Sequence, residues 1–326
     1  MSGVKDRPAG IADHDLMLAL TGVWRLDVEG VRYAPAGAGG YHWVARSAAG
    51  SRWFVTVDDL DGKPWLGGSR DEVFQGLRGA MGTARALRDA AGLAFVAAPR
   101  PARDGGLVLR LSERYALSVF GYLDGTSGRY GEQLPAEERS GLAEMLAALH
   151  GSSHSGTPAH RIGLPRLGLL EQALGELGQA WTGGPYSESA RALLADDAGG
   201  IRQALAAFSD LAARFTAAPK VITHGEPHPG NLIRTGKQLM LLDWDTVGLA
   251  PPERDLWMLP GDALDHYAGL TGKPVNAAGV RLYRLRWALD DIRAYTEDLR
   301  APHSQTPGAE HSWQALRESV RSALDA

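Results

Sequence analysis

The sequence contains no cysteine among its 326 residues. This absence excludes disulfide bonds, catalytic thiols and zinc sites built on cysteine. It also fits a protein of the reducing cytoplasm, which is where we expect the chain to be located.

An excess of positive charge and a long apolar run are missing as well. The formal net charge is −4, so we expect no nucleic-acid partner. No segment approaches the roughly 18 consecutive apolar residues that a membrane span needs. The first ten residues also lack the apolar core of a secretory signal. With 44% hydrophobic and 22% charged residues, the composition is that of a globular protein that does not act in a membrane.

Strand-like segments fill the first third of the chain. β-Branched and aromatic residues, typical of strands, gather in 31–35, 41–46, 52–60, 106–112 and 115–123. Between the third and fourth of these segments, apolar residues spaced three and four apart predict one helix.

Helical patterns dominate the rest of the chain. Two short apolar runs, 220–224 and 238–245, interrupt them and enclose a polar loop. Near the end, five apolar residues form one stripe of a long helix: Leu282, Leu285, Leu289, Ile292 and Leu299. We predict an α+β chain with two lobes, a small β-rich lobe over 1–118 and a larger, mainly helical lobe over 119–326.

The polar loop between the two apolar runs reads VITHGEPHPGNLI. It carries His224, Glu226 and Asn231, and Asp243 follows in the next apolar run. Protein kinases space a His, a catalytic acid, an Asn and a later Asp in a similar way. Phosphoryl transfer needs oxygen ligands for Mg²⁺ and one carboxylate near the attacking hydroxyl. The spacing therefore predicts Asn231 and Asp243 as metal ligands and Glu226 as the base.

Together with the later LMLLDWDTVGLAPPERDL, this loop resembles the signature of the aminoglycoside phosphotransferase family. These kinase-like enzymes phosphorylate small hydroxylated molecules. The resemblance implies a bilobal protein-kinase-like fold, with ATP as donor and Mg²⁺ as cofactor, and GTP as the alternative donor. It also implies that His224 is a structural residue of the loop and that Asp255 braces the local backbone.

The same resemblance assigns the N-terminal lobe to the nucleotide. The glycines of GAGG, Gly37, Gly39 and Gly40, would cover the phosphates, although a simple β-turn would have the same composition. Backbone groups from Ser118 to Phe120 would contact the adenine. His228 is expected to be a solvated residue of the catalytic loop.

Two positions depart from the family pattern. Glu226 stands where the family has Asp, which gives HGE in place of HGD. Thr56 stands where the strand should carry a lysine that binds the nucleotide, and none of the nearest cations, Arg46, Arg52 and Lys63, is clearly in register with it. Glu72 is the acid that would pair with such a lysine.

Candidate acceptor-binding residues lie near the end of the chain. Asp262 and Asp265 form one set. Trp287, Asp291 and Tyr295 form another, and their spacing of four places them on one helix face. An acid between aromatic rings suits an amine, while an ordinary helix interface would have the same pattern.

The sequence therefore predicts a Mg²⁺-dependent phosphotransferase that modifies a hydroxyl of a small molecule. An antibiotic of the aminoglycoside, spectinomycin or macrolide type is one acceptor class. The alternatives are a housekeeping kinase of an amino alcohol or another metabolite, and a nucleotide-binding relative with little or no activity.

Overall fold

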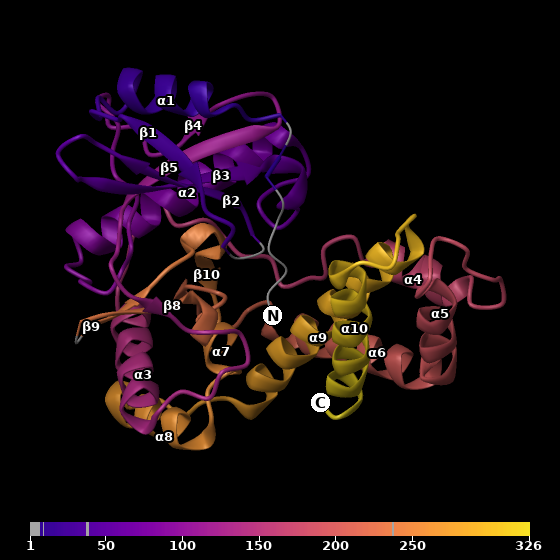
Figure 1. The fold of residues 1–326 in the computed structure, drawn as a ribbon. Helices are drawn as coiled ribbons and strands as arrows, with labels where there is room; N and C mark the ends of the chain where they lie inside the picture. The colour runs from indigo at the N-terminus through magenta and orange to yellow at the C-terminus, as the bar shows by residue number, and fades with distance from the viewer. Residues whose placement is uncertain (1–6, 9, 37–38, 237) are drawn as a thin grey trace. The chain divides into compact units, whose positions relative to one another are not determined.

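The structure is a computed structural model (Figure 1), and the residues it describes are 7–8, 10–36, 39–236 and 238–326. The chain forms two compact units, each assembled from three separate segments. The first unit consists of Met1–His160, Val221–Leu249 and Gly261–Thr271. The second unit consists of Arg161–Lys220, Ala250–Pro260 and Gly272–Ala326.

A five-stranded antiparallel sheet forms the N-terminal part of the first unit (Figure 1). Its strands, in the order β1-β2-β3-β5-β4, are β1 (Gly30–Tyr33), β2 (Tyr41–Arg46), β3 (Arg52–Asp59), β5 (Tyr115–Gly121) and β4 (Leu109–Arg110). One face of the sheet is apolar. There Val55 and Val57 are buried in a cluster with Leu16 and Leu20 of helix α1 (Asp13–Gly22).

The opposite face of the sheet is polar near the ends of β2 and β3. Successive side chains of a strand alternate between faces, so Phe54, Thr56 and Asp58 share this side. The His42 ring stacks on Phe54 with 5.0 Å between ring centroids, and its Nδ1 lies 3.2 Å from Thr56 Oγ1. Asp58 is buried here. A buried carboxylate on a strand needs a partner, and the turn after β3 supplies one.

That turn contains the short helix η1 (Leu60–Gly62) and leads to helix α2 (Arg70–Asp89). Ser69 and Glu72 close the N-terminus of α2 as a capping box. Glu72 Oε2 accepts hydrogen bonds from the N–H groups of Gly68 at 2.7 Å and Ser69 at 3.2 Å. The acid expected to pair with a strand lysine is thus used as a helix cap.

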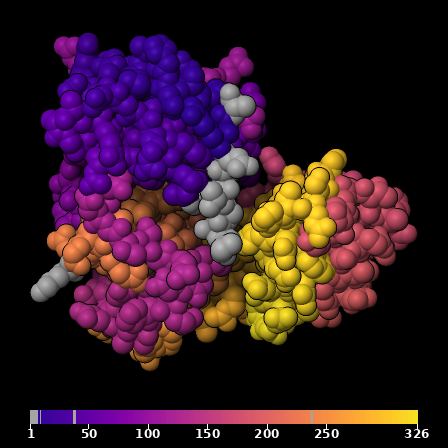
Figure 2. Space-filling model, viewed as in Figure 1, coloured from indigo at the N-terminus to yellow at the C-terminus, as the bar shows by residue number. Residues whose placement is uncertain are grey.

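The remaining elements of the first unit include those that carry the polar loop, and the last residue of strand β10, Ala250, already belongs to the second unit. They are β6 (Thr126–Ser127), α3 (Ala136–His150), β7 (Val221–Thr223), η2 (Pro229–Asn231), β8 (Leu232–Thr235), β9 (Gln238–Leu241), η3 (Trp244–Thr246), β10 (Gly248–Ala250) and α8 (Gly261–Thr271). Strands β6, β8 and β9 form one small sheet and β7 and β10 another. Hydrogen bonds of Leu241 with Phe95 and Ala97 join β9 to the segment after α2. In Figure 2, orange atoms of the unit's later segment lie between the indigo sheet and magenta α3.

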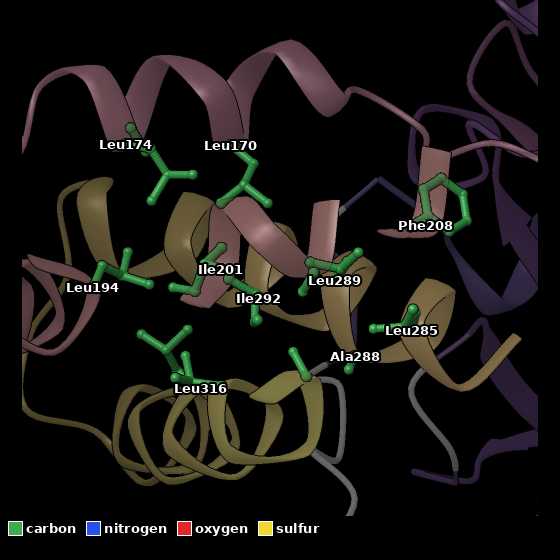
Figure 3. Packing of buried hydrophobic residues seen from close by; sticks show 14 of the residues in the cluster. Leu170, Leu174, Leu194, Ile201, Phe208, Leu285, Ala288, Leu289, Ile292 and Leu316 are labelled. Carbon is green, nitrogen blue, oxygen red and sulfur yellow. The ribbon is translucent and has the colours of Figure 1, made fainter. Parts of the chain in front are cut away.

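The second unit is helical, and its core runs along α9. Its helices are α4 (Leu167–Gly175), α5 (Ser187–Asp196), α6 (Ala198–Phe215), α7 (Glu253–Leu256), α9 (Ala277–Arg300) and α10 (Pro307–Leu324). Figure 3 shows Leu285, Leu289 and Ile292 of α9 among side chains from α4, α6 and α10. The five residues of the predicted stripe on α9 are all buried, which confirms this element and its core face.

Most of the predicted strands and helices are confirmed, but the structure also differs from the prediction. Helix α1 has no counterpart among the predicted elements, and the segment expected as a strand over 106–112 pairs only through the two residues of β4. The predicted lobe boundary between residues 118 and 119 falls inside β5, and the assignment of the two lobes stays a prediction. Among the described residues, no helix combines the length and apolar character that crossing a bilayer requires.

Candidate active site

His224 anchors the polar loop from a fully buried position. Its Nδ1 accepts a hydrogen bond from the backbone N–H of Glu226 at 3.2 Å, and its Nε2 lies 2.8 Å from the carbonyl oxygen of Leu242. Both contacts agree with one neutral tautomer, protonated at Nε2. The ring packs edge-on against Trp244 with 4.7 Å between centroids. His224 therefore joins the loop to the segment that carries Asp243.

Glu226 has its backbone fixed on both sides. Its N–H donates to His224, and its carbonyl oxygen accepts a 2.9 Å hydrogen bond from Asn231 Nδ2. Gly225 precedes it with a φ of 104°, a conformation that favours glycine. The Glu226 side chain is half-buried. The loop thus sets the position of the Glu226 backbone, from which the side chain extends.

Asn231 closes the loop at the end of the 3₁₀ turn η2. Because its amide nitrogen donates to Glu226, its amide oxygen is the atom left to act as a ligand. Its backbone carbonyl accepts a 2.8 Å hydrogen bond from the N–H of Leu242. A backbone hydrogen bond therefore joins Asn231 to Leu242, the residue before Asp243.

Asp243 follows β9 in the left-handed backbone region, with φ 59° and ψ 67°. Few residues other than glycine adopt this conformation, and aspartate is one that tolerates it. Asp243 is exposed, whereas Asp245 two residues later is buried. The Asp245 carboxylate is the main cause that raises the pKa of Asp243 well above its ordinary value. The site thus concentrates negative charge.

Lys63 enters this site from the turn after β3. Its side chain is only 2% exposed, and its Nζ lies 3.0 Å from Asp58 Oδ1 and also forms an ion pair with Asp245. Burial by itself would lower the pKa of Lys63, but Asp245, Asp58 and Asp243 raise it above the ordinary value. Lys63 is therefore an ammonium ion held between carboxylates. The register of β3 does not reveal Lys63 as a residue of this site, because Lys63 lies in the turn after the strand.

The described part of the glycine-rich loop lies beside these carboxylates. A Cβ on Gly39 would be 3.6 Å from Asp243 Oδ2, and one on Gly40 would be 3.4 Å from Asp58 Oδ1 and 3.3 Å from Thr56 Cγ2. Side chains here would fill the space next to the acids. Gly37 lies outside the described residues.

Ser118 and Phe120 lie on β5, opposite Thr56 and Phe54 of β3. The Oγ of Ser118 is buried and has no hydrogen-bond partner in the described part of the chain. Between them, the Val119 carbonyl accepts a hydrogen bond from the N–H of Arg100 at 2.6 Å. One backbone carbonyl of this stretch is therefore already engaged in a hydrogen bond within the protein. Adenine binding by Ser118 and Phe120 stays a prediction.

His228 is half-buried rather than solvated. Its ring packs edge-on against Tyr130 with 5.1 Å between centroids. Burial, with a further contribution from His224, lowers the pKa of His228 to about 4. His228 is therefore neutral in the folded protein at neutral pH.

This lowered pKa predicts a pH dependence of stability. Below about pH 6.5 the unfolded chain protonates His228, while the folded protein does so only near pH 4. The free energy of unfolding should therefore fall as the pH drops from 6.5 towards 4. We expect urea unfolding at pH 7.5 and pH 5.0 to show a smaller loss for His228→Gln than for the wild type. Equal losses in both proteins would contradict the lowered pKa.

The candidate acceptor residues fall into both units. In the first unit, Asp262 on α8 pairs with Arg139 of α3, and Asp265 is exposed. Asp255 is fully buried in α7 of the second unit. Their predicted roles in acceptor binding and backbone bracing stay predictions.

The remaining three candidates share one stretch of α9 in the second unit. The Trp287 ring lies 5.5 Å from that of Trp257, between centroids. Asp291 accepts a 3.4 Å hydrogen bond from Ser319 of α10, and Tyr295 packs edge-on against His311 of the same helix. These contacts are those of a helix interface. Acceptor binding by Trp287, Asp291 and Tyr295 stays a prediction.

Several known structures resemble this chain over most of its length. A spectinomycin phosphotransferase in complex with ADP and spectinomycin matches with a TM-score of 0.76 and 16% identity, covering 96% of this chain and 98% of that one. An amicoumacin kinase with AMP-PNP and Ca²⁺ gives 0.61 and 13%, covering 97% and 94%. An ethanolamine kinase of Plasmodium vivax gives 0.57 and 12%, covering 95% and 89%. At these identities the likeness concerns the fold, and it confirms the predicted α+β protein-kinase-like fold.

Comparison with curated proteins found no match. The model of the phosphotransferase enzyme family matches residues 44–295, which include strands β3, β4 and β5 of the sheet, the polar loop and most of α9. The resemblance seen in the loop thus extends over most of the chain, and the protein belongs to the phosphotransferase enzyme family.

Proposed function

We propose that this protein is a Mg²⁺-dependent phosphotransferase that moves the γ-phosphate of a nucleotide to a hydroxyl of a small molecule. The observation that carries the proposal is the hydrogen-bonded frame around Glu226, Asn231 and Asp243. Asn231 bonds Glu226 through its side chain and Leu242 through its backbone. One short network thus connects the residues that we propose as the base and the two oxygen ligands, and phosphoryl transfer depends mainly on such positioning.

The chemistry of the donor groups fits Mg²⁺. The amide oxygen of Asn231 and the carboxylate of Asp243 are hard oxygen ligands. The pKa of Asp243 responds to three other carboxylates, of Asp245, Glu226 and Asp58, and to a single ammonium, that of Lys63. A divalent cation would relieve this imbalance. Within the described residues, no three His, Asp or Glu side chains form a metal cage, which suits an ion that keeps waters and phosphate oxygens as ligands.

Asn231 and Asp243 would hold the metal, which when bound neutralises charge on the phosphates. Glu226 accepts the proton of the acceptor hydroxyl while the hydroxyl oxygen of the acceptor forms a bond to the γ-phosphorus. The bond between that phosphorus and the oxygen bridging to the β-phosphate breaks, and the nucleoside diphosphate leaves. His224 and Asn231 keep the Glu226 backbone in place throughout. The glycines at 39 and 40 leave space for phosphates next to Asp243 and Asp58.

The donor and the acceptor class are the finer parts of the proposal. ATP is the donor that we propose, since the similar structures include complexes with ADP and AMP-PNP, and GTP is the alternative. The same structures include an antibiotic phosphotransferase and an ethanolamine kinase. They support a small hydroxylated acceptor, either an antibiotic, which would make the protein a resistance enzyme, or an amino alcohol.

A screen of nucleotide consumption tests the function. Release of ADP or GDP is measured with Mg²⁺ against aminoglycosides, spectinomycin, macrolides and amino alcohols. We expect one acceptor class to stimulate release, and EDTA to stop it. The alternative of an inactive nucleotide-binding relative predicts a thermal shift with Mg²⁺ and nucleotide but no acceptor-dependent release. If ATP and GTP give neither release nor a shift, the proposed function is wrong.

A further inference from the structure

We propose that Lys63 is the lysine that binds the nucleotide phosphates in this protein, and that it does so in place of a lysine at position 56. Asp58 and Asp245 are its positioning carboxylates. The proposal rests on the proposed function and adds a binding residue to the site. Three observations support it: the location of the Lys63 ammonium, the carboxylates that hold it, and the role of Glu72 as a helix cap.

The Lys63 ammonium lies at the face where a lysine at position 56 would lie. Thr56 and Asp58 share one face of β3, and Lys63 Nζ lies 3.0 Å from Asp58 Oδ1. Gly40 approaches the same two strand residues, since its Cβ would be 3.3 Å from Thr56 and 3.4 Å from Asp58. The ammonium and the glycine-rich loop thus meet at one carboxylate. The Lys63 ammonium, from the turn after β3, therefore lies in the region where β3 itself supplies no cation.

The ammonium is also fixed in a defined position. Lysine is almost never fully buried unless it is paired, and Lys63 is paired with both Asp58 and Asp245. The Trp65 ring adds a third contact, with its centroid 5.4 Å from Nζ. An ammonium has three N–H donors, and two carboxylate contacts leave one donor for a phosphate oxygen. Two carboxylates on a single lysine also bring more negative charge than it neutralises, which favours an added cation nearby.

Kinases of this fold orient the nucleotide lysine with a glutamate from the helix after the strand. Here Glu72 caps that helix through Ser69 and Gly68. Asp245 instead pairs with Lys63, and it lies two residues after Asp243. The ion pair therefore links the sheet to the segment that carries a proposed metal ligand. The lysine thus lies at position 63 in place of 56, and its acid partner is Asp245 in place of Glu72, so both members of the ion pair have changed together.

Nucleotide binding without metal separates phosphate contact from a purely structural role. We expect Lys63→Met to weaken binding of ATP in EDTA by about 10- to 100-fold, measured by calorimetry, because a charged hydrogen bond is lost. Lys63→Met with Thr56→Lys should regain most of that affinity, since the cation returns to the same face. Lys220→Met, which removes an exposed lysine of the second unit, should bind ATP as the wild type does.

A matched pair of variants covers the case in which Lys63→Met does not fold. Asp58→Asn keeps Lys63 paired with Asp245, and adding Lys63→Met to it removes only the cation. Circular dichroism establishes folding of both, and we expect weaker ATP binding in EDTA for the double variant alone. Unchanged metal-free binding after loss of Lys63 would overturn phosphate contact. A folded Thr56→Lys rescue variant that stays weak would overturn the equivalence of the two positions. If the wild type binds no nucleotide even with Mg²⁺, the proposed function itself fails.

Discussion

Replacing Asp243 with asparagine should lower Mg²⁺-dependent turnover by at least about 10²- to 10³-fold, the scale seen when one preorganised electrostatic group is lost. The substitution removes the carboxylate that we propose as a metal ligand, and it changes little else. Asparagine adopts the left-handed backbone of Asp243 (φ 59°) more readily than most residues. The backbone should therefore stay in place, and the loss reports on charge. Steady-state kinetics and calorimetric titration with Mg²⁺ and nucleotide measure it.

The same variant should be at least as stable as the wild type without metal. The neighbouring Asp245 carboxylate raises the pKa of Asp243, so the folded protein disfavours the charged form of Asp243. Asparagine resembles the neutral form. Asp71→Asn, at an exposed acid of α2 paired with Arg110, is the matched control and should keep wild-type turnover. Unaltered turnover of Asp243→Asn would exclude Asp243 from the metal site.

Replacing Glu226 with glutamine should lower kcat by about 10²- to 10⁴-fold, the contribution of a positioned general base. Nucleotide binding should change little, because the role proposed for Glu226 is at the acceptor hydroxyl and not at the nucleotide. Acceptor-dependent kinetics give kcat, and calorimetry with ATP and Mg²⁺ gives the affinity. A glutamine variant at full rate would show that another group accepts the proton.

Glu226→Asp tests the departure from the family pattern. Aspartate is shorter by about one carbon–carbon bond, roughly 1.5 Å. The backbone cannot follow, because His224 holds the N–H of residue 226 and Asn231 holds its carbonyl. A displacement of about 1 Å can cost on the order of a hundredfold in rate, so we expect Glu226→Asp to be slow as well. Faster turnover would mean that the site is better suited to aspartate.

The sequence was informative where contacts are local. The strands over 41–46 and 52–59, the stripe on α9 and the polar loop all follow from spacing within a few residues. The loop residues also lie close together in space, since Asn231 bonds the backbone of Glu226 directly. The grouping of Glu226, Asn231 and Asp243 in one network therefore followed from a short stretch of chain.

Lys63 could not be found in this way, because its partner Asp245 lies 182 positions further along the chain. Register along β3 considers only residues of the strand, and Lys63 lies in the turn that follows it. The α9 face shows a different limit. Trp287, Asp291 and Tyr295 have the spacing of a binding face and equally that of an interface, and only the position of α10 relates Asp291 to Ser319 and Tyr295 to His311.

The interrupted order of the first unit has a consequence for its biosynthesis. Lys63 and Asp58 leave the ribosome long before Asp245, and residues of the second unit, Arg161–Lys220, are made in between. Until Asp245 has been synthesised, the nascent sheet therefore carries Lys63 and Asp58 without the third member of their ion-pair cluster. Domains usually fold as units during translation. A ribosome-bound chain stalled before β7 should thus lack the assembled candidate site, even if its sheet is already complete.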